Sequence, residues 1–290
     1  MHGGEIRRFH GFVRSNAIFV PDGIDASPGV ARTTCLGIVA HQDDLEFMAF
    51  SAIKGCFDSE SEWFGGVVCT DGSGSSRSGV YAGMSGVELG RVREREQILA
   101  ASVGRYSFVA QLGYASAAIT RPAGGPLVDD LVEILEASSP EVVYTHNPAD
   151  KHPSHIRVLV AVLAALERLP AVKRPRRLLG CEMWRSLDWM DDREKVLLDT
   201  GGFDSLSAAL NGIFDSQIRG GKRYDLAVEG RRRANATLQE SHAGDELDGA
   251  TIAMDLTPLI GRPPSDLRAF ARAHIEKFAS AVDATLESAL

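Results

Sequence analysis

The sequence has 290 residues, a length typical of one large domain or two small ones. Hydrophobic residues make up 44% of it and charged residues 24%, a globular balance that excludes a disordered or fibrous chain. The 39 acidic residues outnumber the 31 Lys and Arg residues, and a net charge of −8 argues against a nucleic-acid-binding protein.

The cysteines and the apolar runs predict the cellular compartment of the protein. Cys35, Cys56, Cys69 and Cys181 are scattered without a C-x-x-C pair, which favours free thiols in a reducing compartment. The first eight residues lack the apolar core of a signal peptide. The longest apolar stretch, 158–166, is far shorter than the ~20 residues of a membrane span. We therefore expect a cytoplasmic protein that does not span a membrane.

Short apolar runs alternate with helical patterns through the first two-thirds of the chain. The pattern predicts strands at 35–40, 65–70, 108–112 and 141–146, and helices at 45–56, 88–103, 127–137 and 155–169. Strands that alternate with helices of crossover length indicate a parallel sheet covered on both faces. The predicted fold is therefore an α/β, Rossmann-like three-layer sandwich with a mostly parallel central sheet.

The pattern becomes less regular after Pro170. It predicts strands at 177–184 and 195–199, and helices at 206–216, 226–240 and 266–290. No internal repeat or low-complexity linker interrupts the chain. We expect a single domain over 1–290, with a core at about 30–200 and a C-terminal elaboration at about 201–290.

Residues that suit a metal ion follow two of the predicted strands. His41-Gln42-Asp43-Asp44 comes after the first strand, and a stretch with two histidines, 147–155, comes after the fourth. Both lie at the carboxyl edge of the sheet, where such folds bind ligands. Imidazole and carboxylate ligands suit a catalytic zinc that keeps one position open. His41, Asp44 and His155 can converge on one ion, with Asp43 and His152 beside it as base and acid.

Each stretch also has an ordinary interpretation. Adjacent aspartates before a helix often cap its free N–H groups. A His-x-x-His pair at a helix start is often a surface or capping feature. Their common place at one edge of the sheet favours the metal site.

The resemblance to a known family rests on four stretches in order along the chain. They are Ala40-His41-Gln42-Asp43-Asp44, Thr70-Asp71-Gly72, Arg93-x-x-Glu96 with Ala100 and Gly104, and Asp150-Lys151-His152-Pro153-Ser154-His155. Over about residues 35–170 the chain resembles the PIG-L/LmbE-like family of zinc-dependent N-acetylglucosaminyl deacetylases. The resemblance implies one divalent zinc ion per chain, held by His41, Asp44 and His155.

The same resemblance implies the catalytic roles. Asp43 is the general base, and a protonated His152 stabilises or protonates the reacting groups. The reaction that the resemblance implies is hydrolysis of an N-acetylated amino sugar to acetate and a free amino sugar. Gln42 stands where the family usually has Pro. Leu45 stands where the family usually has Glu, and Glu46 follows one position later, so the role of Glu46 is open. Ser154 replaces the common Asp between the histidines, which leaves the charge state of His152 open.

The substrate groups are less closely defined by sequence. Candidate substrate-binding residues are Asp71, Arg77, Asn147, Asp150, Trp184 and Arg185. Loop 71–81 fits either a lid over the metal or an ordinary surface loop. The basic stretch 219–233 fits a solvated face, a partner contact such as a homo-oligomer interface, or a site for an anionic group of the substrate.

Three other functions remain open. The first is a metal-dependent amidase or esterase on a non-sugar acyl substrate, since the ligand set does not define the bond. The second is a metal-free glycosidase, although neighbouring carboxylates in a tight turn rarely oppose each other across a sugar. The third is a catalytically inactive metal-binding relative, against which Asp43 and His152 argue.

Overall fold

The structure is a computed structural model that describes residues 7–8, 17–119, 122–239, 242 and 244–290. Residues 1–6, which belong to the stretch without a signal-peptide core, lie outside the described residues. So does residue 240, the predicted end of a helix.

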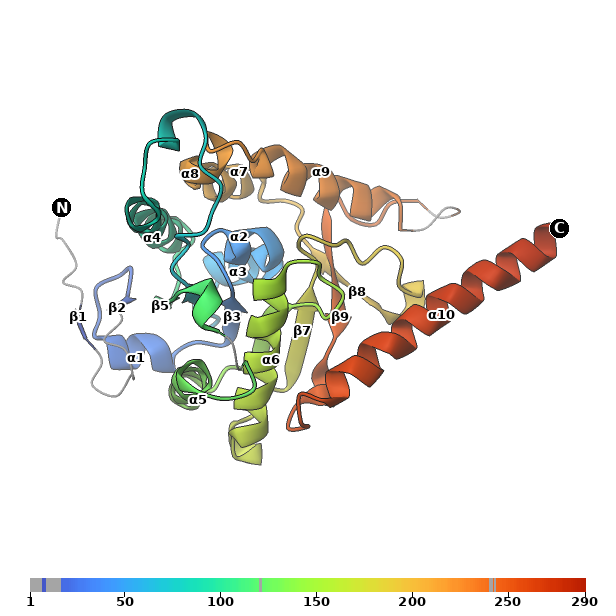
Figure 1. Cartoon of the computed structure of the whole chain (residues 1–290), viewed down its shortest axis with the longest axis horizontal. Helices are drawn as coiled ribbons and strands as arrows, with labels where there is room; N and C mark the ends of the chain where they lie inside the picture. The colour runs from blue at the N-terminus through green and yellow to red at the C-terminus, as the bar shows by residue number, and fades with distance from the viewer. Residues whose placement is uncertain (1–6, 9–16, 120–121, 240–241, 243) are drawn as a thin grey trace.

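Strands and helices alternate along the described chain (Figure 1). The strands are β1 (Arg7–Arg8), β2 (Ala17–Phe19), β3 (Cys35–Val39), β4 (Phe64–Thr70), β5 (Phe108–Tyr114), β6 (Val142–His146), β7 (Arg177–Cys181), β8 (Lys195–Asp199) and β9 (Ala250–Asp255). The α-helices are α1 (Ala26–Ala31), α2 (Asp44–Met48), α3 (Phe50–Phe57), α4 (Gly86–Val103), α5 (Pro126–Ser138), α6 (Pro153–Arg168), α7 (Asp204–Ile213), α8 (Asp215–Ile218), α9 (Tyr224–Thr237) and α10 (Asp266–Ala289). Short 3-10 helices are η1 (Gly79–Tyr81), η2 (Ser116–Ala118), η3 (Ala171–Lys173), η4 (Asp192–Glu194) and η5 (Thr257–Leu259).

The described strands form one nine-stranded sheet in the order β1-β2-β5-β4-β3-β6-β7-β9-β8. Strands β5, β4, β3, β6 and β7 run parallel, and β2, β9 and β8 pair antiparallel at the two sides. This confirms the predicted α/β fold with a mostly parallel sheet. The strand order reverses between β3 and β6, and ligands bind at the carboxyl ends of strands at such a switch point.

Two layers of helices cover the sheet. One face packs against α1, α5 and α6, with Leu131 and Leu159 in its core. The other face packs against α2, α3, α4 and α7, with Leu45, Ile53 and Leu210 in its core. Figure 1 shows these two groups of helices on opposite sides of the sheet, with α9 beside the second group.

The predicted elements differ from the structure at several places, among them the helix expected over 206–216, which is also two helices, α7 and α8. The helix expected over 45–56 is two helices, α2 and α3, which meet at Ala49. The strand expected over 177–184 ends at Cys181, and the chain then turns toward the carboxyl edge of the sheet. Strand β9 was not predicted, although its buried apolar run follows the turn pair Asp248-Gly249.

Helix α10 differs from the other helices in its surroundings. It runs away from the body of the molecule in Figure 1, and Leu267 is its one buried residue. In the part of the chain that is described, no helix is long and apolar enough to cross a membrane.

A close contact between α2 and the sheet positions the turn after β3. Gly37 in β3 and Gly66 in β4 are partners in the parallel register, and the Leu45 side chain lies over both. A Cβ atom at Gly37 would lie 2.5 Å from Leu45 Cδ2, and one at Gly66 would lie 2.5 Å from Leu45 Cδ1. The two glycines therefore let α2 start directly against the sheet.

Gly37→Ala tests this contact. We expect a loss of about 1–3 kcal/mol in the free energy of unfolding, because the added methyl overpacks Leu45 in a filled core. Urea denaturation measures it. Gly55→Ala in α3 is the matched control, since a Cβ there meets nothing within 4 Å. Equal stability of the two variants would contradict the packing argument.

Candidate active site

The turn from β3 into α2 carries the first group of site residues. Asp43 has φ 91° and ψ −31°, which is uncommon for a residue other than glycine. Its amide N–H donates to Gln97 Oε1 at 3.2 Å, and its carbonyl accepts from Phe47 N–H at 3.1 Å. This sharp turn directs the side chains of His41, Asp43 and Asp44 into one cavity.

Three donor atoms converge where β3 and β6 end. His41 Nδ1 lies 3.2 Å from Asp44 Oδ2 and 3.2 Å from His155 Nε2, and His155 Nε2 lies 3.4 Å from Asp44 Oδ2. With metal–ligand bonds of about 2.0–2.1 Å, two ligands of a tetrahedral zinc are ~3.3 Å apart. The triangle of these three atoms thus matches one face of a zinc tetrahedron, and the residues fit the metal that the sequence predicts.

Asp150 holds His155 in place. Asp150 Oδ2 lies 3.1 Å from His155 Nδ1, so Nε2 faces the other two donors. Carboxylates commonly orient metal-binding histidines in this way. Burial lowers the pKa of His155, but Asp44 and Asp150 together raise it to about 9. Burial opposes ionisation of Asp44, whereas His155 and His41 hold its pKa well below the usual value.

His146 is a neighbour of this cluster that the sequence analysis did not identify. It is fully buried, and its ring stacks on that of His155 at 3.8 Å between centroids. His146 Nε2 lies 3.7 Å from Asp44 Oδ2 but accepts the Ala40 N–H at 2.9 Å. The lone pair that a metal would need is thus engaged with β3. We assign His146 to linking the ends of β3 and β6.

A buried network holds Asp43. Arg93 NH2 donates to Asp43 Oδ2 at 3.1 Å and to the Gln42 carbonyl at 2.6 Å. Burial raises the pKa of Asp43, and the charge of Arg93 opposes this. The Gln97 amide nitrogen donates to Glu46 Oε1 at 2.7 Å, and this contact directs Gln97 Oε1 toward the Asp43 N–H.

Glu46, whose role the sequence left open, belongs to this support. It is fully buried, and Tyr106 O–H donates to its Oε1 at 2.7 Å. Burial raises the pKa of Glu46 to about 7. It therefore acts behind the site, on Gln97.

His152 lies beside the three donors, and its ring centroid is 4.9 Å from that of His41 and 4.7 Å from that of His155. Its Nδ1 accepts the Ser154 N–H, so a neutral ring carries its proton on Nε2. Burial and the charges of His155 and His41 lower the pKa of His152 to about 4. This low pKa favours the neutral ring for His152, whose charge state the sequence left open.

These groups open into a cavity of about 280 Å³ at the carboxyl edge of the sheet. Its walls are His41, Asp43, Asp44, Gly72, Gly74, Ser75, Ser76, Arg93, Ser116, His152, Ser154, Met183, Trp184, Gln217, Lys222 and Tyr224. Trp184 is the one predicted substrate residue among them. Asp71, Arg77 and Arg185 do not line this cavity; Asp71 accepts from Ser73, and Arg77 donates to the Met84 carbonyl.

Two predicted substrate residues have structural contacts instead. Asn147 is fully buried, and its amide bonds the Cys181 carbonyl at 2.9 Å and the Ala149 N–H at 2.9 Å. The Asp150 side chain is also fully buried and accepts from His152 N–H, Trp184 N–H and His155. Neither side chain is available to a substrate, because all of these partners belong to the fold.

Loop 71–81 forms one wall of the cavity through its glycines and serines. Ser78 O–H donates to the Gly220 carbonyl at 2.6 Å, and Tyr81 O–H donates to Asp215 Oδ2 at 2.6 Å. Arg93 also donates to Ser75 Oγ. The loop is thus tied to α8 and to Arg93, as a cover over the site would be.

The C-terminal elaboration supplies the opposite wall. Glu96 accepts from Ser216 N–H at 2.7 Å and from Ser216 O–H at 2.6 Å, which fixes α8 against α4. Gln217, Lys222 and Tyr224 then reach the cavity. Sequence analysis missed these three as site residues, although Lys222 and Tyr224 fall in the basic stretch it singled out.

Comparison with solved structures places the fold in a known group. A 4-carboxy-2-hydroxymuconate hydratase, GalB from Pseudomonas putida KT2440, is 17% identical with a TM-score of 0.58, covering 77% of this chain and 95% of its own. The N,N'-diacetylchitobiose deacetylase from Pyrococcus horikoshii is 19% identical with a TM-score of 0.57, covering 77% and 84%. The A40926 pseudoaglycone deacetylase Dbv21 is 17% identical with a TM-score of 0.55, covering 77% and 97%. At these identities the similarity shows the fold, and a hydratase shares that fold with deacetylases.

The fold and the edge-of-sheet cluster thus define a Rossmann-like α/β protein with His and Asp side chains suited to a metal. Two overlapping groups have ligand atoms within 4.8 Å of one another: His41, His152 and His155, and Asp44, His146 and His155. The sequence profile of the PIG-L family, described as GlcNAc-PI de-N-acetylase, matches residues 36–166. The match confirms, for this part of the chain, the resemblance to the PIG-L/LmbE-like family that the motifs predicted. Comparison with curated proteins gave no significant match.

Asp150→Asn tests the support of His155. We expect zinc affinity to fall about 10–100-fold, because the histidine loses the carboxylate that orients it. Competition with a chromophoric chelator measures the affinity. Asp71→Asn is the matched control, since Asp71 does not line the cavity. Equal affinities of the two variants would show that Asp150 does not act on the metal site.

Proposed function

We propose that this protein is a zinc-dependent hydrolase that removes the N-acetyl group from an N-acetylglucosamine-type sugar or glycoconjugate. The observation that carries the proposal is the triangle of His41 Nδ1, Asp44 Oδ2 and His155 Nε2, with sides of 3.2–3.4 Å, next to the Asp43 carboxylate in one cavity. The family match and the deacetylases among the similar structures support the reaction type.

His41, Asp44 and His155 would hold the ion. A bound zinc ion supplies Lewis acidity to an acyl oxygen and makes water a stronger nucleophile at neutral pH. The remaining chemistry falls to side chains of the chain itself.

Asp43 is the proposed general base. Its carboxylate lines the same cavity as His41 and Asp44, and Arg93 fixes one of its oxygens at 3.1 Å. The Arg93 contact keeps the carboxylate in one orientation and favours its ionised form. A base held in this way accepts a proton from water, a step typically worth on the order of 10²–10⁴-fold in rate.

His152 is the proposed group that faces the acyl oxygen. Its neutral ring has a proton on Nε2, because Nδ1 accepts from Ser154. A fixed N–H donor stabilises negative charge that develops on the acyl oxygen during attack. Asp43, protonated by then, is positioned to return its proton to the leaving amine.

The composition of the cavity suits a sugar. Serine hydroxyls, Gln217 and Lys222 offer polar contacts, and the Trp184 and Tyr224 rings lie 6.1 Å apart at its edge. Sugars bind where hydrogen-bonding groups meet an apolar platform. The proposed partner is therefore a small amino-sugar substrate, with no nucleic acid and no membrane in the reaction. The cytoplasmic location expected from the sequence stays a prediction.

The deciding experiment measures acetate release by the purified, zinc-loaded protein. N-acetylglucosamine, its glycosides, N-acetylated alkylamines and acetate esters form the substrate panel. We expect turnover of the amino sugars above the others, and loss of it with a chelator. Preferred turnover of alkylamides or esters would favour the amidase or esterase alternative. No acetate from any compound, with zinc bound, would refute the hydrolase.

Asp43→Asn separates the base from the metal site. We expect kcat to fall at least about 100-fold, since an amide accepts no proton from water. Metal content measured by atomic emission should stay near one ion per chain, because the three donors remain. Asp71→Asn is the matched control, because Asp71 does not line the cavity. Turnover by Asp43→Asn close to that of the wild type would remove Asp43 from the mechanism.

A further inference from the structure

A second cavity adjoins the candidate active site. It also measures about 280 Å³, and Met183, Trp184 and Tyr224 line both cavities. Its other walls are Phe47, Lys151, Glu182, Ala227, Val228, Arg231, Arg232 and Thr251. Sites for ligands of moderate size are usually about 300–1,000 Å³. Either cavity alone falls just below that range, whereas the two together fall within it.

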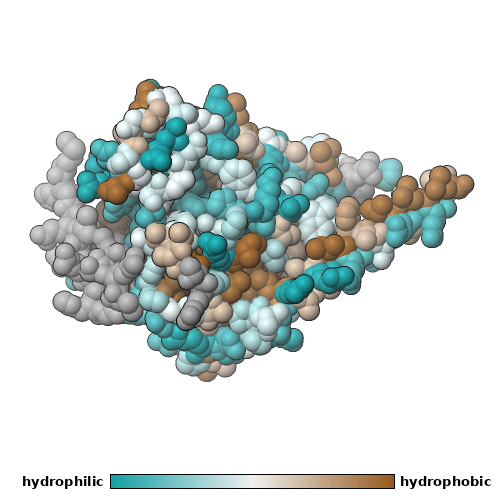
Figure 2. Space-filling model, in the orientation of Figure 1, coloured by the Kyte–Doolittle hydropathy of each residue, from teal (hydrophilic) through white to brown (hydrophobic). Residues whose placement is uncertain are grey.

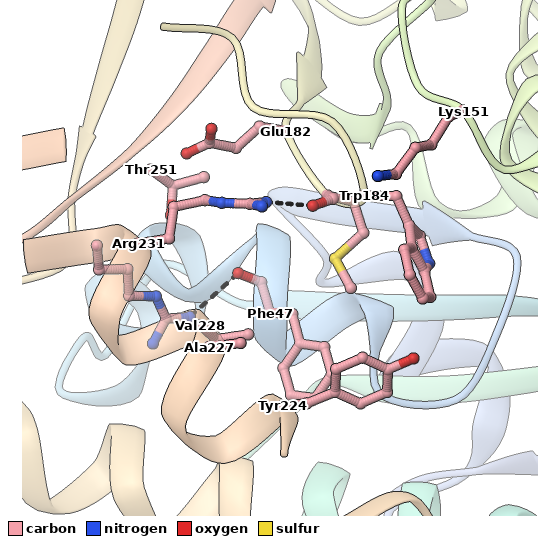
Figure 3. Close-up of a pocket in the computed structure, with 11 residues that line it drawn as sticks. Phe47, Lys151, Glu182, Trp184, Tyr224, Ala227, Val228, Arg231 and Thr251 are labelled. Carbon is pink, nitrogen blue, oxygen red and sulfur yellow. Dashed lines mark hydrogen bonds between the residues drawn. The ribbon is translucent and has the colours of Figure 1, made fainter. Parts of the chain in front are cut away.

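The walls of the second cavity are apolar with a basic edge. Phe47 and Tyr224 meet edge-to-face, with ring centroids 5.5 Å apart. Figure 3 shows the Lys151 amine directed toward the Trp184 ring, and its Nζ lies 6.0 Å from the ring centroid. Lys222 Nζ lies 5.2 Å from the same centroid. Two ammonium groups therefore lie near a ring that lines both cavities.

Glu182 and Arg231 both line this cavity and interact electrostatically: burial raises the pKa of the Glu182 carboxyl, and the charge of Arg231 opposes that rise. Among the described residues, no carboxylate forms an ion pair with Lys151, Lys222 or Arg231. Glu182 is the carboxylate in the wall, and its oxygens accept from Asn235, Ile252 N–H and Leu187 N–H. Arg231 donates to the Met183 carbonyl. Arg232 is buried and donates to Ser207 Oγ and to the Glu46 carbonyl. A ligand with a negative charge would thus meet Lys151 and Arg231.

We propose that the second cavity binds the part of the substrate beyond the acylated sugar, as an apolar ring that carries an anionic group. The ring would pack between Trp184, Tyr224 and Phe47, with its carboxylate or phosphate at Lys151 and Arg231. This rests on the proposed hydrolase function and names the class of substrate for it. Most of the walls lie outside residues 36–166, so the cavity belongs to this chain more than to the matched family domain.

Two synthetic substrates test the proposal: phenyl and 4-carboxyphenyl glycosides of N-acetylglucosamine. We expect kcat/KM to be about tenfold higher for the carboxyphenyl compound, since two partly exposed ion pairs contribute about two- to fivefold each. Lys151→Gln and Arg231→Gln should each lower that ratio by about this factor. Lys173→Gln, in η3 after the end of α6, is the control and should keep the wild-type ratio.

A filled cavity gives an independent measure. Ala227→Trp, on the exposed side of α9, should remove the advantage of both aryl glycosides over N-acetylglucosamine. Equal kcat/KM values for all three substrates in the wild type would refute the second cavity and leave the hydrolase intact. Calorimetry measures the binding of 4-carboxyphenyl glucosaminide separately from catalysis. If Lys151→Gln weakens this binding while no substrate releases acetate, the result supports the cavity and refutes the hydrolase.

A separate observation concerns helix α10. Ile275, Phe278, Val282 and Leu286 are exposed by 40–52% and repeat at intervals of three and four residues. At about 100° per residue they form one stripe along the helix. Figure 2 shows apolar side chains along this extended helix at the right of the view. The Phe278 ring meets Trp189 at 6.1 Å between centroids, whereas beyond Phe278 the helix runs away from the body of the molecule and its stripe suits a partner.

The charges beside the stripe indicate which partner. Arg268 and Arg272 lie on one flank near the start of the helix, and Asp283 and Glu287 lie on the same flank near its end. Glu276 shares this flank and accepts from Arg272 Nε at 2.8 Å, so the first half of the flank carries one net positive charge and the second half two negative charges. In an antiparallel helix pair, equal flanks of the two helices face each other. The basic half of one α10 would then meet the acidic half of another. We propose that α10 pairs antiparallel with α10 of a second copy of this chain.

Light scattering of the full chain after size-exclusion chromatography tests this pairing. We expect a mass twice the 31.2 kDa of one chain. Val282→Glu with Leu286→Glu should give a monomer, whereas Ala284→Glu on the opposite face should not. Arg268→Glu with Arg272→Glu should weaken the dimer, and adding Asp283→Arg with Glu287→Arg should restore it. A wild-type monomer at all concentrations, or a dimer insensitive to the stripe, would overturn the pairing.

Discussion

The site depends on how closely the first turn of α2 lies against the sheet. Leu45 packs over Gly37 and Gly66, and this contact places the preceding turn, with Asp43 at φ 91°, at the end of β3. Such backbone geometry costs about 1–3 kcal/mol. Full burial of a leucine contributes about 1.5–3 kcal/mol, which is of the same size. The packing behind the turn thus offsets the strain in it, and Gln97 fixes the remaining freedom of the Asp43 amide.

The second constraint is electrostatic. Asp43 and Asp44 are adjacent and buried, so each needs a positive partner of its own. Arg93 is the partner of Asp43, whereas Asp44 faces His41 and His155. With Asp150 behind it, His155 has a pKa of about 9. The space between the three donors therefore favours a positive charge, and a divalent ion competes there with one proton.

Much of this arrangement was predictable from short motifs, because strand ends at a switch point bring distant loops together. The place of His41, Asp44 and His155 follows from that rule alone. The role of Asp150 could not be predicted in this way, because the sequence around Asp150 is the same whether its carboxylate contacts a substrate or a histidine nitrogen. The direction of α6 in the structure distinguishes these two roles. Lys222 and Tyr224 were missed as site residues because their contact with the site spans more than 170 residues from Asp44 and leaves no local pattern.

Chemistry and selectivity are thus divided along the chain. Residues 36–166, which match the family, contain the donors, Asp43 and His152. Loop 71–81 supplies one outer wall, and segments after β7 supply the other. Glu96 of α4 bonds Ser216 of α8, and Glu182 bonds Ile252 of β9, which ties these later segments to the core. In the proposed hydrolase, a change in those walls would alter which substrate is accepted without moving His41, Asp44 and His155, which lie after β3, in α2 and in α6. The same catalytic edge can therefore serve different substrates, as a fold shared by deacetylases and a hydratase requires.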